Sequence, residues 1–192
     1  RVVGFTRDEE GYIDNLGTGI DDANALKSSG GRATLLWEPT DRLSLEARIS
    51  REKSTPEDSS LINPDLGMDK RFSDRPDKFT GTMTNYNLTL GYQFDKATLT
   101  SSSTWSDYDA LFNVDLAGTY GQAFAFALDA PAEYSSFVQE VRLVSDTGGP
   151  WDWVLGGFYY ERDRDVFFNY RSNEEYLAQS GITGLPDEYY QK

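Results

Sequence analysis

Segments in which apolar and polar residues alternate constrain this chain more than any other feature of its sequence. In residues 43–50, one face of an extended strand carries Leu43, Leu45, Ala47 and Ile49, and a polar residue follows each of them. Residues 85–94 repeat the pattern around Leu88. A sheet of such strands has one apolar and one hydrophilic face, which indicates antiparallel pairing with one face in water.

The lengths of the connections narrow the fold further. The alternation and the turn residues predict seven strands, at residues 2–7, 31–38, 42–51, 85–94, 97–108, 134–145 and 151–164. Connections after Glu38, Phe94 and Ser145 are short, and they alternate strictly with long polar loops. All short turns therefore fall at one end of the sheet, as in an outer-membrane barrel. We predict an all-β fold, a segment of an antiparallel transmembrane β-barrel with short periplasmic turns and long extracellular loops.

The composition argues against several classes of protein. The length of 192 residues fits one domain. With 26% charged residues and a mean hydropathy of −0.59, no stretch approaches the roughly 18 apolar residues of a membrane helix, whereas a barrel strand shows lipid only every second residue. The net charge of −14 argues against nucleic acid. Cysteine and histidine are both missing, and we predict neither a metal nor a cofactor.

Aromatic residues gather near both ends of the predicted strands. The predicted belt residues are Trp37, Tyr86, Tyr92, Phe94, Trp105, Trp151, Trp153 and Tyr159. From Tyr86 to Phe94 the strand spans roughly 27 Å, or about 20 Å in height at a tilt of about 40°, close to the ~25 Å apolar band of an outer membrane. The outward residues predicted to contact lipid are Leu35, Leu43, Leu45, Ile49, Leu88, Leu90, Val141, Leu143 and Leu155.

Several stretches resemble TonB-dependent receptors, particularly the expanded set of sphingomonad-like bacteria. The residues that carry the resemblance are Gly11-Tyr12-Ile13-Asp14-Asn15, Gly31-Arg32-Ala33, Leu36-Trp37-Glu38-Pro39-Thr40-Asp41, Ser135 to Ser145 and Trp151 to Tyr160. In this order, each at a strand edge or turn, the motifs are fairly specific. The resemblance covers nearly the whole chain, and the loops match least.

The resemblance implies active import across the outer membrane of a Gram-negative bacterium. Such receptors hold a plug inside a barrel of about 22 strands, and a TonB-type protein pulls on the plug. The implied partners are that TonB-type protein, the plug, lipopolysaccharide and membrane lipid, and a small ligand, most often a ferric siderophore. Neither a plug nor C-terminal barrel strands are found within residues 1–192, so we expect about a third of a barrel, from its middle.

Two sets of side chains are candidates for ligand contact. The lumen-facing charges Glu46, Arg48, Glu140 and Arg142 either steer a ligand or form cross-strand ion pairs in a wet barrel. Loop aromatics either stack on a ligand or pack the loops together: Phe72, Phe79, Phe112, Tyr120, Phe124 and Phe126, with Tyr189 and Tyr190 in the same class. The loop carboxylates Asp58, Asp65, Asp69, Asp74 and Asp77 do not match a calcium loop, and we expect them to be solvated.

There are three alternatives to a receptor. An enzyme would need paired carboxylates, and neither Asp152 with Glu161 nor Asp107 with Asp109 implies a cleft, so we expect no catalysis. A soluble β-sandwich that binds carbohydrate would gather its aromatics on one platform. A small complete barrel would need an eighth strand within residues 123–129 or 173–190.

Overall fold

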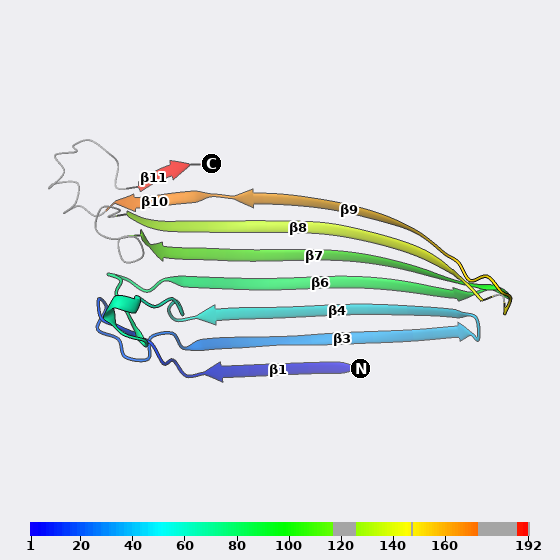
Figure 1. The fold of residues 1–192 in the computed structure, drawn as a ribbon, viewed down its shortest axis with the longest axis horizontal. Coiled ribbons are helices and arrows are strands. Elements are labelled where there is room, and N and C mark those ends of the chain that lie inside the picture. The colour runs from blue at the N-terminus through cyan, green and yellow to red at the C-terminus, as the bar shows by residue number, and fades with distance from the viewer. Residues whose placement is uncertain (117–125, 147, 173–187, 192) are drawn as a thin grey trace.

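The computed structural model describes residues 1–116, 126–146, 148–172 and 188–191, and these form a single layer of long antiparallel strands (Figure 1). The main strands are β1 (Val2–Glu9), β3 (Leu26–Thr40), β4 (Leu43–Pro56), β6 (Lys78–Gln93), β7 (Ala97–Asp115), β8 (Phe126–Ser145), β9 (Val154–Val166), β10 (Phe168–Ser172) and β11 (Glu188–Gln191). Two short strands, β2 (Asp14–Asn15) and β5 (Lys70–Arg71), form a small parallel sheet, and η1 (Pro64–Leu66) is a 3-10 turn.

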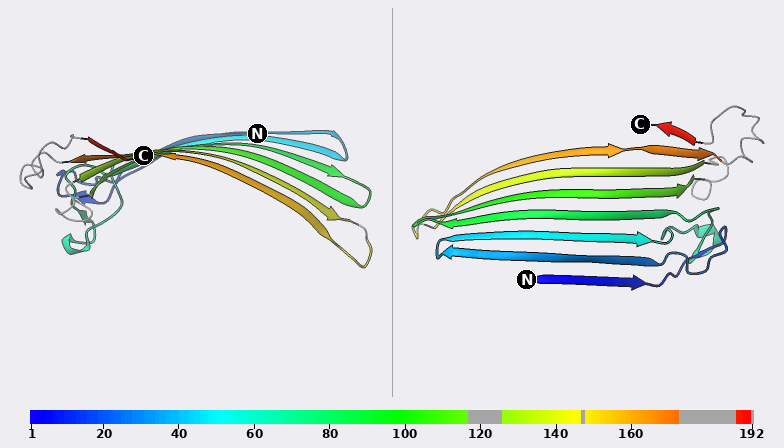
Figure 2. Two further views of the ribbon diagram at one scale, coloured as in Figure 1. Left: turned by 90° about the horizontal axis from the view of Figure 1, so that it is seen from above. Right: turned by 180° about the vertical axis from the view of Figure 1, so that it is seen from behind.

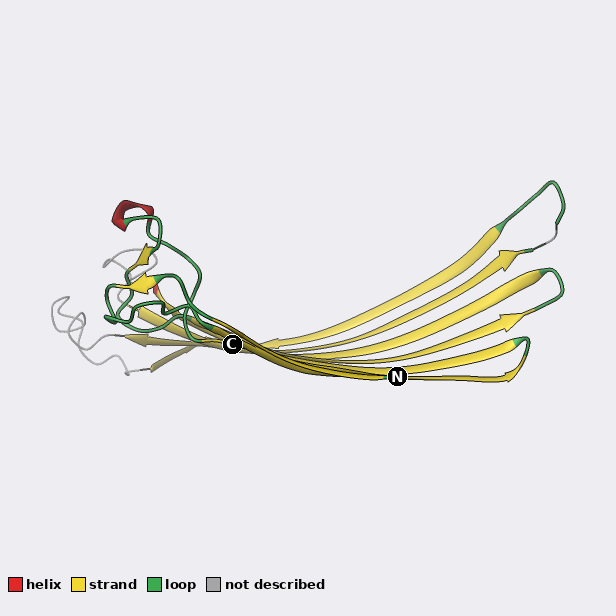
Figure 3. Cartoon of the chain, turned by 90° about the horizontal axis from the view of Figure 1, so that it is seen from below, coloured by secondary structure: helices red, strands yellow, loops and turns green. Residues whose placement is uncertain are grey.

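Neighbours along the chain are neighbours in the sheet. The order is β1-β3-β4-β6-β7-β8, with β9 and β10 both paired to β8, and β11 paired to β10. The sheet is open, twisted and bowed along its strands (Figures 2 and 3). In the described residues no second large sheet packs on it, which contradicts the β-sandwich alternative. No helix in this part of the chain is long and apolar enough to cross a membrane.

The strand register sorts the side chains onto two faces, because directly opposite residues in antiparallel strands point the same way. Leu45 lies opposite Leu90, and Ala47 lies opposite Leu88, on what we call the apolar face. Residues that alternate with these form the polar face, where Arg48 lies opposite Asn87. The sheet has no dry interior, since Leu155 on the apolar face is 67% exposed. The apolar face therefore needs a covering that this part of the chain does not supply.

The three short turns lie at one end of the sheet, the turn end, and the long loops lie at the other, the loop end (Figure 1). β3 continues to Thr40, two residues beyond its predicted end at Glu38, so the first turn falls at Asp41 and Arg42. Its position follows from Thr40, whose Oγ1 accepts hydrogen bonds from the N–H groups of Arg42 (3.3 Å) and Leu43 (3.1 Å). Such side-chain capping is a common way to fix a turn.

At the loop end the strands run further than predicted. β7 continues to Asp115 and β8 begins at Phe126, so much of the predicted loop 110–133 is strand. The chain after Asp165 was predicted to be loop, and this is wrong: β10 continues the pairing with β8, and β11 contains Tyr189 and Tyr190. On β7, Asp107 and Asp109 share the face of Trp105, whereas Ala110, Phe112 and Val114 lie on the other face, so the pattern of the central sheet does not continue into the extension.

Residues 10–25 and 57–77 fold together at the loop end, and we call them the loop unit (Figure 3). β2 pairs with β5 within it, and Ile13, Asn15 and Ser73 are fully buried. Gly11 is required for this packing, because a Cβ at that position would lie 1.8 Å from the carbonyl oxygen of Asp22. The loop unit is thus a packed structure, unlike the solvated loops that the sequence predicted.

Candidate functional site

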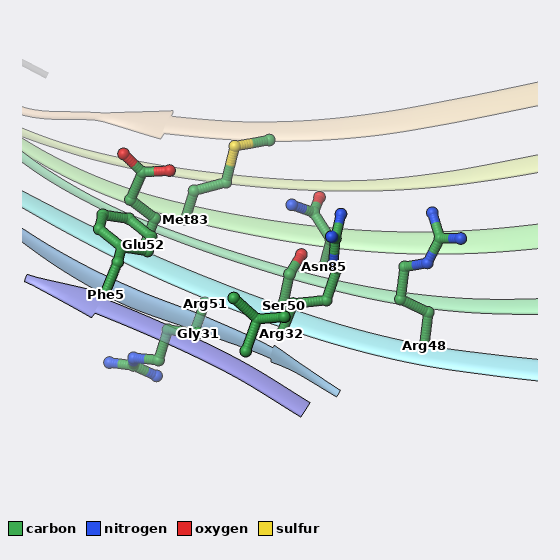
Figure 4. A pocket seen from close by; sticks show the side chains of 10 residues that line it. Phe5, Gly31, Arg32, Arg48, Ser50, Arg51, Glu52, Met83 and Asn85 are labelled. Carbon is green, nitrogen blue, oxygen red and sulfur yellow. The ribbon is translucent and has the colours of Figure 1, made fainter. Parts of the chain in front are cut away.

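Two neighbouring grooves occupy the polar face toward the loop end, and Met83 lines both. The first, the arginine groove, has a volume of about 400 Å³ (Figure 4). It is lined by Val3, Phe5, Gly31, Arg32, Arg48, Ser50, Arg51, Glu52, Met83 and Asn85. The second, the tyrosine groove, has a volume of about 380 Å³ and is lined by Met83, Ser106, Tyr108, Tyr134, Ser135, Ser136, Tyr160 and Arg162.

Strand register builds the arginine groove. Arg48, Ser50 and Glu52 alternate along β4, so all three point to the polar face. Ser50 lies opposite Arg32 on β3 and opposite Asn85 on β6, so these three side chains form a row across the strands. Arg48 and Glu52 lie on either side of this row. The result is a hydrophilic floor with polar side chains from three adjacent strands and charged groups from β3 and β4.

Stacked cations and rings characterise the tyrosine groove. The guanidinium carbons of Arg162 and Arg164 lie 4.9 and 5.5 Å from the ring centroid of Tyr134. The Tyr108 and Tyr134 rings are 6.0 Å apart. Since a stacked guanidinium keeps its edge donors free, this arrangement can hold a flat anionic group through both ring and charge contacts.

Cations on the polar face are largely unpaired. Among the described residues, none of Arg32, Arg142, Arg162 and Arg164 has a carboxylate within 4.0 Å. Arg48 pairs with Glu46 at 2.8 Å, along the same strand. In a chain of net charge −14, this concentration of free guanidinium groups makes the polar face suited to an anionic ligand.

A buried ion network holds the loop unit together. Arg71 binds Asp58 and also Asp77, the latter at 2.6 Å, and the three side chains are 4%, 1% and 5% exposed. The Asn15 amide donates to Asp58 and to the Ser73 hydroxyl, both at 2.7 Å. Asp58 and Asp77 were predicted to be solvated, and this is wrong. Their burial follows from the guanidinium and amide donors that Arg71 and Asn15 bring to them.

The loop unit is also tied to the main sheet. The N–H of Asp115 on β7 donates to the Asp77 carboxylate, and the N–H of Asp74 donates to the Asp115 carboxylate at 2.6 Å. Arg75 pairs with Asp129 on β8 at 3.2 Å. The loop unit is therefore fixed relative to the ends of β7 and β8, above the two grooves along the strand direction.

Burial raises the pKa of the Asp77 carboxyl, against the opposing effects of the Asp115 N–H and the Arg71 guanidinium. Because the pKa is higher in the folded than in the unfolded state, the contribution of Asp77 to stability is complete below the ordinary Asp pKa of about 3.9 and is lost as pH rises through the folded value. We expect Asp77→Asn to remove this part of the pH dependence. Hydrogen-exchange protection of the loop unit, corrected for intrinsic rates, measures it; an unchanged pH profile in the variant would contradict the assignment.

The ion pair between Lys70 and Asp14 gives the pH dependence of stability the opposite sign, and it does so at lower pH. Lys70 donates to Asp14, and this bond lowers the pKa of the Asp14 carboxyl and raises that of the Lys70 amine. The share of stability from Asp14 is present above its ordinary pKa and lost as pH falls through the lowered value. The pair is partly exposed, so its effect is small.

The predicted lumen-facing charges all lie on the polar face, but they do not form the predicted cross-strand ladder. Glu46 lies opposite Leu36 and Thr89, and Glu140 lies opposite Ser102 and Phe158. Opposite charges therefore do not face each other across these strands, and the one pair, Glu46 with Arg48, lies along β4. Their role in steering a ligand stays a prediction.

The predicted loop aromatics are dispersed. Phe79 and Phe112 belong to β6 and β7, not to loops, and their rings contact each other at a centroid distance of 4.2 Å. Phe72 is an exposed residue of the loop unit. Phe126 begins β8, and Tyr120 and Phe124 lie outside the described residues. The structure brings Phe79 and Phe112 together but does not join them to Phe72 as one site.

All nine predicted lipid-contacting residues lie on the apolar face by register. Tyr86 and Trp105 share one row with Phe137, which is not among the predicted belt residues, and the Trp105 and Phe137 rings are 5.0 Å apart. Tyr159 lies one row nearer the turn end, opposite Gln139. Trp37, Tyr92, Phe94, Trp151 and Trp153 lie toward the turn end. Contact of these residues with lipid stays a prediction.

No protein-family model and no curated protein matches this sequence. Among solved structures, the chain is similar to the crystal structure of the ferric yersiniabactin uptake receptor FyuA from Yersinia pestis, with a TM-score of 0.74 and 20% sequence identity over 89% of this chain. The fold is that of part of an uptake-receptor barrel. The chain spans 27% of the length of that receptor, and at this identity the similarity concerns the fold alone.

Proposed function

We propose that this chain forms part of the barrel wall of a TonB-dependent outer-membrane receptor. The scarce ligand that we propose it imports is a ferric siderophore. The observation that carries the proposal is the open antiparallel sheet with one apolar face and one polar face, joined by short turns at one end and long loops at the other. In hydrocarbon every backbone polar group needs an internal partner, and a closed barrel of such strands provides it.

In this proposal the apolar face contacts membrane lipid and the polar face lines the lumen. The turn end is periplasmic, and the loop unit is extracellular, where lipopolysaccharide surrounds it. The plug would lie against the polar face and transmit force from a TonB-type protein. The chain acts by binding and not by catalysis: Asp107 and Asp109 lie on the same face as Tyr86 and Trp105, so they point away from both grooves.

Support for an anionic ligand comes from the two grooves. The unpaired guanidinium groups and the stacked Tyr134 ring provide the contacts that a flat, negatively charged chelate requires. The similarity in fold to a receptor for ferric yersiniabactin agrees with a siderophore.

Uptake of iron tests the proposal. The whole protein is produced in a Gram-negative strain that lacks its own siderophore receptors, and radioactive iron uptake is measured with ferric catecholate and ferric hydroxamate complexes. We expect uptake that needs both this protein and TonB. Uptake that persists without TonB, or no uptake of any ferric complex, would contradict the proposal.

The tyrosine groove gives a more local prediction. Replacing Arg162 by Gln removes one charged contact while leaving the strand intact, and we expect the affinity for the imported ferric complex to fall about tenfold, since a charge-assisted hydrogen bond contributes roughly 1.5 kcal/mol or more. Titration of the purified protein measures the affinity. Arg42→Gln is the matched control, because Arg42 lies in the turn between β3 and β4, at the other end of the sheet from both grooves; an equal loss in both variants would contradict the assignment.

A further inference from the structure

The arginine groove has opposite charges at its two ends. Figure 4 shows Glu52, Phe5 and Met83 at one end and Arg48 at the other, with Ser50 and Asn85 between them. On an extended strand, Arg48 and Glu52 are four residues, or roughly 13 Å, apart. Arg32 lies opposite Ser50, so it is a diagonal neighbour of both, about 7 Å from each.

The carboxylate in the arginine groove is that of Glu52. In the described part of the chain it has no ion pair, although Arg32 is within reach of a long side chain. Arg48 is already bound to Glu46, on the side away from Glu52. A carboxylate left free among arginines weakens a site for a simple anion, so its presence calls for a positively charged group on the ligand.

The ring of Phe5 lies next to the Glu52 carboxylate. Gly30 lies opposite both Phe5 and Glu52, and a Cβ at Gly30 would come within 2.7 Å of Cε1 and 2.9 Å of Cζ of Phe5. The Phe5 ring therefore lies where a side chain of β3 would otherwise be, next to Glu52. The ring is 44% exposed, so its surface is open to the groove. A carboxylate beside an exposed ring is a favourable arrangement for an ammonium group.

We propose that the arginine groove binds a ligand that carries both a protonated amine and an anionic group, the amine at Glu52 and Phe5 and the anionic group at Arg32 and Arg48. This inference rests on the proposed function and specifies the ligand further: the imported complex is zwitterionic at the part that enters this groove. The two charged groups on the ligand are separated by roughly 7 to 13 Å, as the strand spacings require.

Three probes of one shape test this inference on the purified whole protein. They are a ferric trihydroxamate with one free amine and one free carboxylate, its N-acetyl derivative, and its methyl ester. We expect the doubly charged probe to bind at least tenfold more tightly than either derivative. Glu52→Gln should abolish the discrimination against the N-acetyl derivative and keep that against the methyl ester. Arg32→Gln should do the reverse.

The outcomes separate the two proposals. If the protein binds all three probes equally, or if Glu52→Gln discriminates as the parent does, the zwitterion site is wrong while the receptor function stands. If it binds none of them and takes up no ferric complex, both proposals fail. Asp41→Asn, which removes a carboxylate in the turn between β3 and β4, at the other end of the sheet from the groove, is the control and should retain both discriminations.

Discussion

Arg71→Ala is expected to open the loop unit at a cost of about 3 to 5 kcal/mol, because two carboxylates would remain buried without their cation. Arg71 is the basic partner of both Asp58 and Asp77, and all three side chains are almost completely buried. The N–H of Leu16, which donates to the Arg71 carbonyl at 2.9 Å, reports on this opening. Its hydrogen-exchange protection in the whole protein should fall by two orders of magnitude or more.

Lys70→Ala is the matched control for Arg71→Ala. Lys70 is the adjacent residue of the same short strand, and its ion pair with Asp14 is partly exposed, so we expect its removal to lower the protection only slightly. Similar losses in the two variants would show that the network does not stabilise the loop unit. Replacing Asp58, Arg71 and Asp77 together by neutral residues of similar size should restore much of the protection.

Leu88→Arg is expected to impair assembly of the barrel, at a cost of about 2 to 4 kcal/mol near the middle of the membrane. Leu88 lies at mid-height on the apolar face, between Ala47 and Ser103. Asn87→Arg is the control on the next residue of the same strand. Its side chain points to the polar face, beside Ser102 and Thr104, so we expect it to be tolerated.

Folded protein in the outer membrane, measured by its heat-modifiable mobility in gels, compares these two variants. The two substituted residues are adjacent, so their position in the strand is nearly the same. Equal damage from both substitutions would contradict the assignment of the faces.

The sequence predicts the central sheet well because a physical pattern repeats there. In residues 43–49 of β4 and 86–92 of β6 every second residue is apolar, so strand type, pairing and face follow from the period of two. In the strand extensions at the loop end, the apolar residues do not stay on the face that they occupy in the central sheet. On β7, for example, Asp107 and Asp109 share the face of Trp105, and the sequence pattern breaks where the strand continues.

The loop unit and the grooves depend on contacts between residues far apart in sequence. Asn15 is buried by Asp58 and Ser73 of another loop, and Arg71 by two carboxylates of its own segment, 13 and 6 residues away. A polar loop looks solvated in sequence whether or not its charges are paired. Arg162 and Arg164 alternate along β9, so their shared face could be predicted. Their stacking on Tyr134 could not, because it depends on the register set by the turn between β8 and β9.

Measuring which side chains of β6 contact lipid and which contact water tests most directly whether lipid covers the apolar face. Single cysteines are introduced into the whole protein at each of residues 85–90 and are labelled with nitroxides in a lipid bilayer. Residues 1–192 contain no native cysteine that would be labelled as well. Collisions with oxygen report lipid, and collisions with a water-soluble nickel chelate report water. We predict oxygen contact at Tyr86, Leu88 and Leu90 and nickel contact at Asn85, Asn87 and Thr89. Nickel contact at all six positions, or no alternation, would show that lipid does not cover the apolar face.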